Sequence, residues 1–320
     1  MARSVKIEQR GRVLLARLHN PPHNFMTASM VVELERLVER ADADPGVGAV
    51  ILTGEHPSAF ITHYDVAEIL SRSTRFERPL PPVLAGWGLR AVAGIERVPG
   101  VRAALRHTPA SGVLEMRRVH HVFRRMNRAR AAFVAAINGT ATGGGCELTL
   151  ACDVRIISSR GGPIGQPEIL LGLTPGGGST QRLSRMLGQA RAIELILEGR
   201  LLDPREAADL GLVHRVVPAE KLMEEAWATA ERLARRAPNT IALAKRAVYE
   251  GGSKSIQAGL HFEQSAYLST TVAPPAIRAM RTYVAAIEED SSPALADAAR
   301  RKPWFEGTAV DLLTRQPNRH

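Results

Sequence analysis

Short runs of consecutive apolar residues separate longer segments in which apolar residues recur every three or four positions. Continuous runs are typical of strands buried on both faces, and the longer spacing is typical of helices. Between the first two runs, a helical pattern begins after Thr27 and ends at Asp44-Pro45-Gly46, where proline and glycine stop a helix. This alternation predicts an α/β layer architecture. The predicted strands are residues 13–18, 47–52, 131–137 and 154–157.

The segment of residues 72–127, between two of the predicted strands, has a helical pattern of its own. A first set of apolar residues ends at Pro99-Gly100, and a second amphipathic pattern starts at Gly112. The sequence therefore predicts an inserted helical segment in the form of a hairpin. The first set consists of Trp87, Leu89, Val92, Ile95 and Val98, and the second includes Val113, Met116, Phe123 and Met126.

The net charge of +10 is concentrated in this region. Residues 71–130 hold 13 arginines and three glutamates, so the rest of the chain is balanced. Basic amphipathic helices are typical of surfaces that bind anionic membranes. Few aromatic residues lie between the arginines, which argues against nucleic acid as a partner. Three interpretations of this arginine-rich region remain open: contact with a membrane surface, binding of another anionic ligand, or a surface that is only solvated.

The composition is that of a globular protein, with 45% hydrophobic and 23% charged residues among 320. This composition excludes a disordered or collagen-like chain. Cys146 and Cys152 are too few for a disulfide framework or a four-cysteine zinc site. No apolar signal region follows the basic residues near Met1, so we expect a cytoplasmic protein.

The chain is mostly helical in pattern from Arg182 onward. The segment after Pro218 carries apolar stripes that the core of a single chain need not cover. These stripes predict an interface between subunits, and therefore an oligomer. We therefore expect a core of residues 1–218 and a C-terminal helical oligomerisation part of residues 219–320. The stripe consists of Leu222, Met223, Ala226 and Leu233.

Two glycine-rich stretches contain glutamates in positions suited to proton transfer. Gly143, Gly144 and Gly145 open a predicted helix, where backbone N–H groups and the helix dipole favour an oxyanion. Glu147 lies about one turn further along. Glu168 follows a proline and precedes an apolar run, which places it at the edge of the core. A tight turn with an exposed glutamate, or a first-turn acid, is the alternative interpretation of each stretch taken alone.

Together the two stretches resemble the central motifs of the crotonase superfamily, the enoyl-CoA hydratases and isomerases. The resemblance is carried by AAINGTATGGGCELTLACDVRI (135–156) and GQPEILLGLTPGGGSTQRL (165–183). Weaker similarity occurs at residues 18–27, 43–54 and 300–307. The resemblance covers nearly the whole chain apart from the inserted segment and residues around 271–290. It implies a ββα spiral core, a C-terminal helical trimerisation part, and a homotrimer or hexamer.

The resemblance also implies the ligand and the site residues. The ligand would be an acyl-CoA thioester, in which coenzyme A is part of the substrate, and neither a metal nor a separate cofactor is expected. Glu147 and Glu168 would be the catalytic residues, and the N–H groups of Tyr64 and Gly144 would form the oxyanion hole. The remaining residues implied to contact substrate or coenzyme A are His63, Asp65, Val66, Ala67, Gly143 and Lys302.

The oxyanion loop departs from the family pattern. The family usually has a small, glycine-containing run before an aspartate, whereas this chain has His63 and Tyr64 before Asp65. A backbone donor is kept by every residue except proline, so Tyr64 still supplies one. His63 would be strained if its position required a positive φ.

Two glutamates beside an oxyanion hole suit the addition of water to a 2-enoyl thioester. One carboxyl group deprotonates the water that attacks C3, and the other protonates C2. Family branches that isomerise, hydrolyse or decarboxylate commonly lack one of the two, so the sequence favours an enoyl-CoA hydratase. The alternatives are a related isomerase or acyl-CoA hydrolase with an altered pocket, or a non-catalytic member that binds acyl-CoA or membrane. We also expect residues 72–127 to form a lid over the acyl chain.

Overall fold

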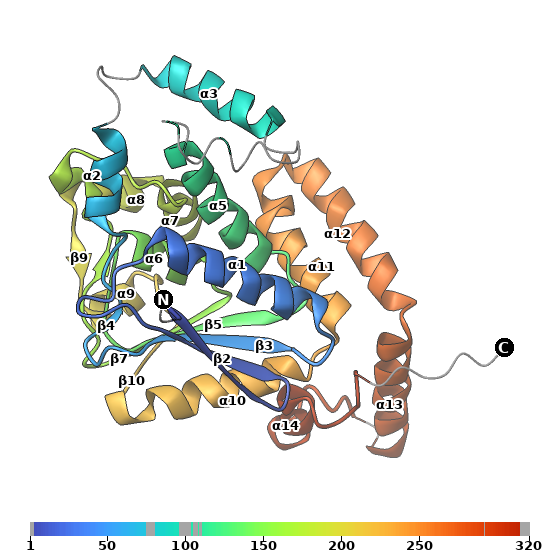
Figure 1. The fold of residues 1–320 in the computed structure, drawn as a ribbon. Helices are drawn as coiled ribbons and strands as arrows, with labels where there is room; N and C mark the ends of the chain where they lie inside the picture. Colours follow the sequence, from blue (N-terminus) through green and yellow to red (C-terminus); the bar gives the residue numbers. More distant parts are fainter. Residues whose placement is uncertain are drawn as a thin grey trace.

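The computed structural model describes residues 3–74, 81–95, 104, 108, 111–290 and 292–313. A larger sheet has the strand order β1-β2-β3-β5-β7-β10 (Figure 1). Only β1 is antiparallel to its neighbour in this sheet. Its strands are β1 (Val5–Arg10), β2 (Val13–Leu18), β3 (Ala49–Gly54), β5 (Ala132–Ile137), β7 (Val154–Ser158) and β10 (Arg215–Val217).

A smaller sheet has the order β4-β6-β8-β9, in which β4, β6 and β8 run parallel. All four predicted strands are present, and the chain is of the predicted mixed α/β class. The strands of this sheet are β4 (Ala59–Ile61), β6 (Thr140–Thr142), β8 (Ile164–Gly165) and β9 (Leu201–Leu202).

Helices connect and cover the two sheets (Figure 1). Those before the middle of the chain are α1 (Ala28–Ala43), α2 (Val66–Ser73), α3 (Pro82–Ile95), α5 (Ser111–Met126) and α6 (Gly144–Ala151). Those that follow are α7 (Ser179–Leu187), α8 (Gln189–Glu198), α9 (Pro204–Asp209), α10 (Leu222–Ala234), α11 (Pro238–Tyr249), α12 (Ile256–Thr271), α13 (Pro274–Asp290) and α14 (Ala298–Glu306). Single 3₁₀ turns are η1 (Glu168–Leu171), η2 (Ala219–Lys221) and η3 (Gly251–Ser253).

Helix α1 forms as the sequence predicts. The Thr27 hydroxyl accepts a hydrogen bond from the Met30 N–H and caps the helix. Its apolar residues Met30, Val31, Leu34, Leu37 and Val38 are buried in the main core. Burial of such a stripe supplies most of the stability of a helix in a protein.

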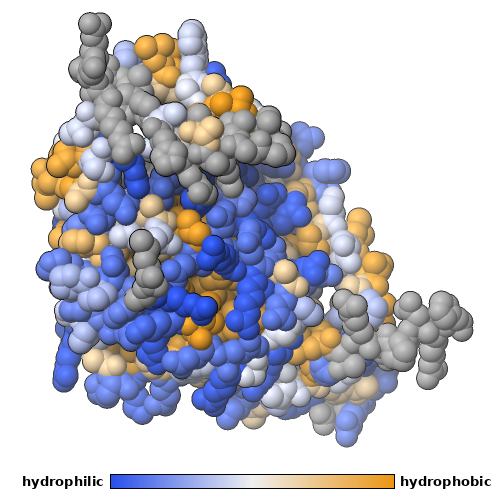
Figure 2. All heavy atoms as spheres, viewed as in Figure 1, coloured by the Kyte–Doolittle hydropathy of each residue, from blue (hydrophilic) through white to orange (hydrophobic). Residues whose placement is uncertain are grey.

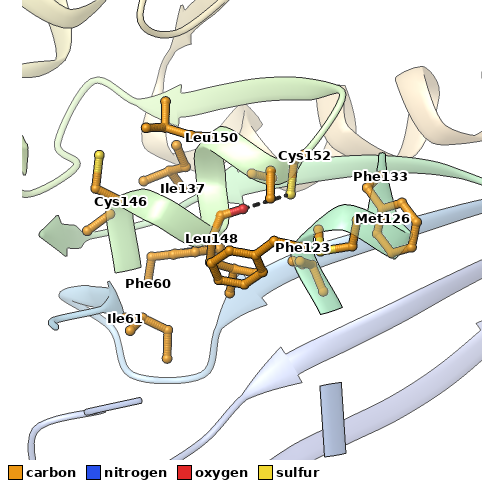
Figure 3. Close-up of a cluster of buried hydrophobic side chains, with 14 of the residues drawn as sticks. Phe60, Ile61, Phe123, Met126, Phe133, Ile137, Cys146, Leu148, Leu150 and Cys152 are labelled. Carbon is orange, nitrogen blue, oxygen red and sulfur yellow. Dashed lines mark hydrogen bonds between the residues drawn. The ribbon is translucent and has the colours of Figure 1, made fainter. Parts of the chain in front are cut away.

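Alternate residues of the central strands enter two different apolar layers. Leu14 and Val50 join the main core with α1, α5 and α6, whereas Val13 and Ile51 join a second cluster on the opposite face. The main core also takes side chains from β4, α5, β5 and α6, as Figure 3 shows. Helix α6 is buried on every side, so the glutamate that it carries is held inside the core.

Helix α10 covers the second face of the sheet within the same chain. Leu222, Ala226, Ala230 and Ala234 are buried there. The apolar stripe after Pro218 therefore packs on the sheet of its own chain. The prediction that this stripe forms an interface with another subunit is wrong. The first helix of residues 219–320 belongs to the core of the single chain.

The inserted segment contains the helices α3 and α5, which differ in their contacts. Helix α5 buries Val119, Val122, Phe123 and Met126 in the main core. Helix α3 buries only Val92. Within the described residues, α3 is thus the part of the segment that packs least against the rest of the chain, and the lid over the acyl chain stays a prediction.

Several arginines of α5 are paired with acids of the core. Arg118 lies 3.1 Å from Glu35, and Arg125 lies 3.0 Å from Glu39. Arg128, two residues after the end of α5, pairs with Glu250. The positive charge of this helix is therefore used partly inside the molecule, which weakens the interpretation of α5 as a binder of external anions.

Hydrophobic side chains remain exposed on α3 and along the C-terminal helices. Figure 2 shows them at the top of the view over α3 and along its right-hand edge over α12. Within the described part of the chain, no helix combines the length and apolar character needed to cross a bilayer. The exposed residues on the C-terminal helices include Leu260, Leu268, Val272, Met280 and Val284.

Candidate active site

The predicted site residues lie just after three parallel strands of the smaller sheet. His63 and Tyr64 follow β4, Gly143 and Gly144 follow β6, and the segment that leads to Glu168 follows β8. Because the carboxyl ends of parallel strands meet at one edge of a sheet, three segments far apart in the sequence converge there.

Glu147 is held by the backbone of a glycine-rich loop. Its side chain is buried, and its Oε1 accepts hydrogen bonds from the N–H groups of Gly177 at 2.6 Å and Ser179 at 3.1 Å. A Cβ at Gly177 would lie 2.3 Å from Glu147 Oε2, so any larger residue there would push this carboxyl group aside. Arg182 of α7 donates to the Gly177 carbonyl at 3.1 Å and thus holds the loop.

Gln166 links the second glutamate to the same loop. With its amide oriented so that both polar atoms are paired, Gln166 donates to the two Glu168 oxygens at 2.9 and 3.1 Å. Its oxygen accepts from Ser179 Oγ at 2.7 Å. Since the Ser179 N–H binds Glu147, a continuous polar chain connects the two glutamates.

Burial is the main influence on both glutamates. It raises the pKa of Glu147 to about 7, and the nearby negative charge of Glu168 adds to this effect. The N–H groups of Ser179 and Gly177 and the charge of Arg182 oppose it. Burial also raises the pKa of Glu168. A carboxyl group with a pKa near neutrality can both accept and release a proton at pH 7.

The raised pKa of Glu147 predicts that its removal stabilises the protein at high pH. Below pH 4.5 the carboxyl group is neutral in both the folded and the unfolded chain, but above about pH 7 folding must bury its charge. The stability of the native protein therefore falls as pH rises from 4.5 to 7. Glu147→Gln should raise Tm at pH 8 by a few degrees, because ~1 kcal/mol moves Tm by about 2–4 °C in chains of roughly 200 residues.

Thermal unfolding of both proteins at pH 5 and pH 8 measures this difference. The gain should shrink toward pH 5, where the native carboxyl group is protonated. The control is Glu198→Gln on the exposed face of α8, which should change Tm little at either pH. A Tm difference that is equal at both pH values would contradict the prediction.

Two backbone N–H groups, those of Tyr64 and Gly144, lie close together beside these glutamates. A Cβ at Gly144 would lie 3.3 Å from the Tyr64 nitrogen, so the two residues are in contact. Within the described residues, neither N–H donates a hydrogen bond. The carbonyls of the same two peptides do accept bonds, the His63 oxygen from Met26 and the Gly143 oxygen from Glu147. Such bonds polarise the peptides and strengthen their free N–H groups as donors.

Gly143 occupies a position that requires glycine. Its φ is +48°, and a Cβ there would lie 3.2 Å from Glu168 Oε1 and 3.6 Å from His63 Cβ. His63 itself is not strained, because Asn24 is the one non-glycine residue of the described chain with a positive φ. The condition for strain at His63, a positive φ, is therefore not met. Its ring stacks on Phe25 at 4.4 Å, and its Nδ1–H donates to the Tyr64 carbonyl at 2.8 Å.

The other residues implied to contact coenzyme A fall into two groups. Asp65 caps α2 by accepting from the Ala67 N–H at 2.9 Å, and Val66 and Ala67 are exposed in its first turn. They thus lie directly beside the oxyanion loop. Lys302 lies on α14, which packs near α10 and α13, and a single chain does not bring it to the site (Figure 1).

Sequence reasoning missed the residues that support the glutamates. Gln166, Gly177, Ser179 and Arg182 all lie within the second glycine-rich motif, but that motif alone does not show which backbone or side chain reaches which carboxyl group. The described residues contain no cluster of three or more histidines, cysteines or acids that could hold a metal ion. The arrangement suits proton transfers next to a thioester carbonyl, with the N–H pair stabilising the enolate oxygen.

Known proteins share both the sequence and this architecture. The profile of the enoyl-CoA hydratase/isomerase family matches residues 8–88 and 104–285. A probable enoyl-CoA hydratase of Rhizobium meliloti is 34% identical over 280 residues, 87% of this chain and 94% of the relative. A short-chain-enoyl-CoA hydratase of Clostridium acetobutylicum is 32% identical over 265 residues, 82% of this chain and 88% of the relative.

A crystal structure of an enoyl-CoA hydratase from Bacillus anthracis superposes with a TM-score of 0.71 at 28% identity. The match covers 91% of this chain and 98% of the other. The family profile leaves out residues 89–103, which lie within the inserted segment. The family match, the relatives and the shared fold agree with the geometry of the site, and the chain belongs to the enoyl-CoA hydratase/isomerase family.

Proposed function

We propose that this protein is an enoyl-CoA hydratase that adds water across the C2=C3 double bond of a 2-enoyl-CoA. The observation that carries the proposal is the presence of two connected glutamates, Glu147 buried and Glu168 partly buried, beside a pair of free backbone N–H groups. The thioester carbonyl accepts from Tyr64 and Gly144, which stabilises the negative charge that develops on its oxygen. One glutamate of the pair takes a proton from water as its oxygen bonds to C3, and the other gives a proton to C2.

The substrate in this proposal is an acyl-CoA thioester, and the reaction needs no metal or separate cofactor because both proton transfers use glutamates. The test is the loss of enone absorbance when the purified protein meets crotonyl-CoA and longer 2-enoyl-CoAs. Chromatography of the product distinguishes a 3-hydroxyacyl-CoA from a shifted double bond or from free coenzyme A. Either of the last two as the main product would favour the isomerase or the hydrolase instead.

We also propose a trimer-based oligomer. Support comes from the large hydrophobic residues left exposed on α12 and α13, since contiguous exposed apolar surface commonly marks an interface. Another chain would then have to bring Lys302 to the coenzyme A site. Light scattering at micromolar concentration should give three or six times the mass of the 34.7 kDa chain.

A charge on the exposed helix should weaken this assembly. Leu268→Glu replaces a leucine that is 65% exposed on α12 with a charge that an interface must desolvate. The matched control is Gln257→Glu, at an exposed polar position of the same helix. We expect a smaller mass for the first variant and the native mass for the second, whereas a monomeric native protein would defeat the proposal.

A further inference from the structure

The side chain of Tyr64 is tied into a charged cluster on α2. Its hydroxyl donates to Glu68 Oε2 at 3.1 Å and accepts from Arg72 Nη1 at 3.3 Å. Arg72 Nη2 donates to the same Glu68 oxygen at 2.9 Å. The three side chains form a closed triangle: Glu68 and Arg72 lie four residues apart on one face of α2, and Tyr64 lies just before the helix. The triangle is partly buried, which strengthens its charge-assisted bonds.

This cluster reaches two further helices. Glu68 Oε2 also accepts from the N–H of Ala28, the first residue of α1, at 3.1 Å. Arg72 Nη2 lies 3.8 Å from Glu115 Oε2 on α5. Burial raises the pKa of Glu115, and the charges of Arg72 and Arg118 oppose that effect. The hydroxyl of one tyrosine is thus anchored to α1, α2 and α5 together.

The main chain on both sides of Tyr64 is held by Met26, which lies just before α1. Met26 donates its N–H to the His63 carbonyl at 2.8 Å, and its own carbonyl accepts from the Asp65 N–H at 2.8 Å. Met26 and Ala28 are two residues apart, so one short segment holds the backbone on both sides of Tyr64 and, through Glu68, its side chain. What stays unbound within the described residues is the Tyr64 N–H.

We propose that Glu68 and Arg72 are positioning residues of the oxyanion hole, which fix the direction of the Tyr64 N–H through the tyrosine hydroxyl. Glu115 extends this support to α5. The inference rests on the proposed function, in which the Tyr64 N–H binds the thioester carbonyl. A small residue at position 64 would have no hydroxyl to anchor, so this support depends on the tyrosine that sets the chain apart from the usual family loop.

The absorption spectrum of a bound conjugated thioester reports directly on how well the Tyr64 N–H is positioned. A well-aimed N–H polarises the carbonyl of 2,4-hexadienoyl-CoA and shifts its absorption to longer wavelength. The spectrum is recorded in the Glu168→Gln background, so that the probe is not consumed. Tyr64→Phe keeps the ring and removes only the hydroxyl, and Arg72→Met removes the charge at similar length.

Both variants should reduce the red shift. In the otherwise native protein they should lower kcat by about 3–10-fold with a smaller change in KM, because the oxyanion hole acts mainly in the transition state. The double variant should be little worse than the worse single variant, since the two act through one network. The control is Tyr283→Phe, which removes a hydroxyl from a tyrosine on α13 that packs against Trp304 and should leave the spectrum and kcat unchanged.

Two results would count against the inference, and they differ in meaning. If Tyr64→Phe and Arg72→Met both leave the red shift of the Glu168→Gln background and the kcat of the native protein unchanged, the positioning role alone is overturned. A Glu168→Gln protein that binds the probe with no red shift would contradict the oxyanion hole and the proposed function with it. Thermal unfolding of each variant shows whether a lost shift accompanies a lost fold. Glu68→Gln, which keeps an acceptor oxygen, gives a further variant in case Arg72→Met fails to fold.

Discussion

Replacement of either glutamate by glutamine should reduce kcat for hydration at least about 10²-fold, because each carries a proton transfer that the other cannot perform. Glutamine fills nearly the same volume as glutamate, and at position 147 it keeps an oxygen that can accept from the N–H groups of Gly177 and Ser179. The loss therefore reports on proton transfer rather than on packing. The measurement is steady-state hydration of a 2-enoyl-CoA by Glu147→Gln and Glu168→Gln.

The double substitution separates a cooperating pair from two independent effects. Residues that act as one unit are strongly non-additive, so the double variant should be little slower than the slower single variant. Two single variants with native rates would refute the assignment of Glu147 and Glu168. If the loss of kcat in the double variant equals the product of the two single losses, each glutamate acts independently.

A single methyl group at Gly177 should cause the second large loss. Its Cβ would lie 2.3 Å from Glu147 Oε2, so the carboxyl group must move away from its two N–H donors. A displacement of about 1 Å of a catalytic group can cost about 10²-fold in rate. We expect Gly177→Ala to lower kcat by about 10–100-fold.

The preceding residue offers a matched control for that experiment. A Cβ at Gly176 would contact nothing within 4 Å, and neither glycine has a positive φ that alanine would strain. Gly176→Ala should therefore keep nearly native kcat, and its thermal unfolding should resemble that of the native protein. Equal losses in the two alanine variants would show that loop flexibility matters, rather than the position of Glu147.

Much of the fold follows from the apolar pattern. The buried runs at β2, β3, β5 and β7 predict strands because a strand covered on both faces needs apolar residues at every position. The helical spacing after Thr27 predicts α1 for the same physical reason. Periodicity shows that a face is apolar, however, and not what covers it. For this reason the stripe on α10 predicts an interface with another subunit, although it covers the chain's own sheet.

Motif resemblance predicts the two glutamates of the candidate site. It does not predict the residues that hold them in place. Glu147 and Glu168 lie in motifs that the sequence shows plainly. Gln166 connects them only because β8 ends beside β6, which depends on contacts between distant segments. The backbone angle of His63 is likewise set by its neighbours in the folded chain, so a departure from the family's glycine could not reveal whether it is strained.

The position of α10 has a consequence for how the chain can fold during synthesis. The strands β2, β3 and β5 are complete once residue 137 has been made, but the helix that covers their second face ends only at Ala234. A nascent chain between these two points presents alternate valines, leucines and isoleucines to water, a surface that is prone to aggregation. Fragments that end at Pro218 should share this liability. The smallest piece able to fold alone must therefore extend through α10.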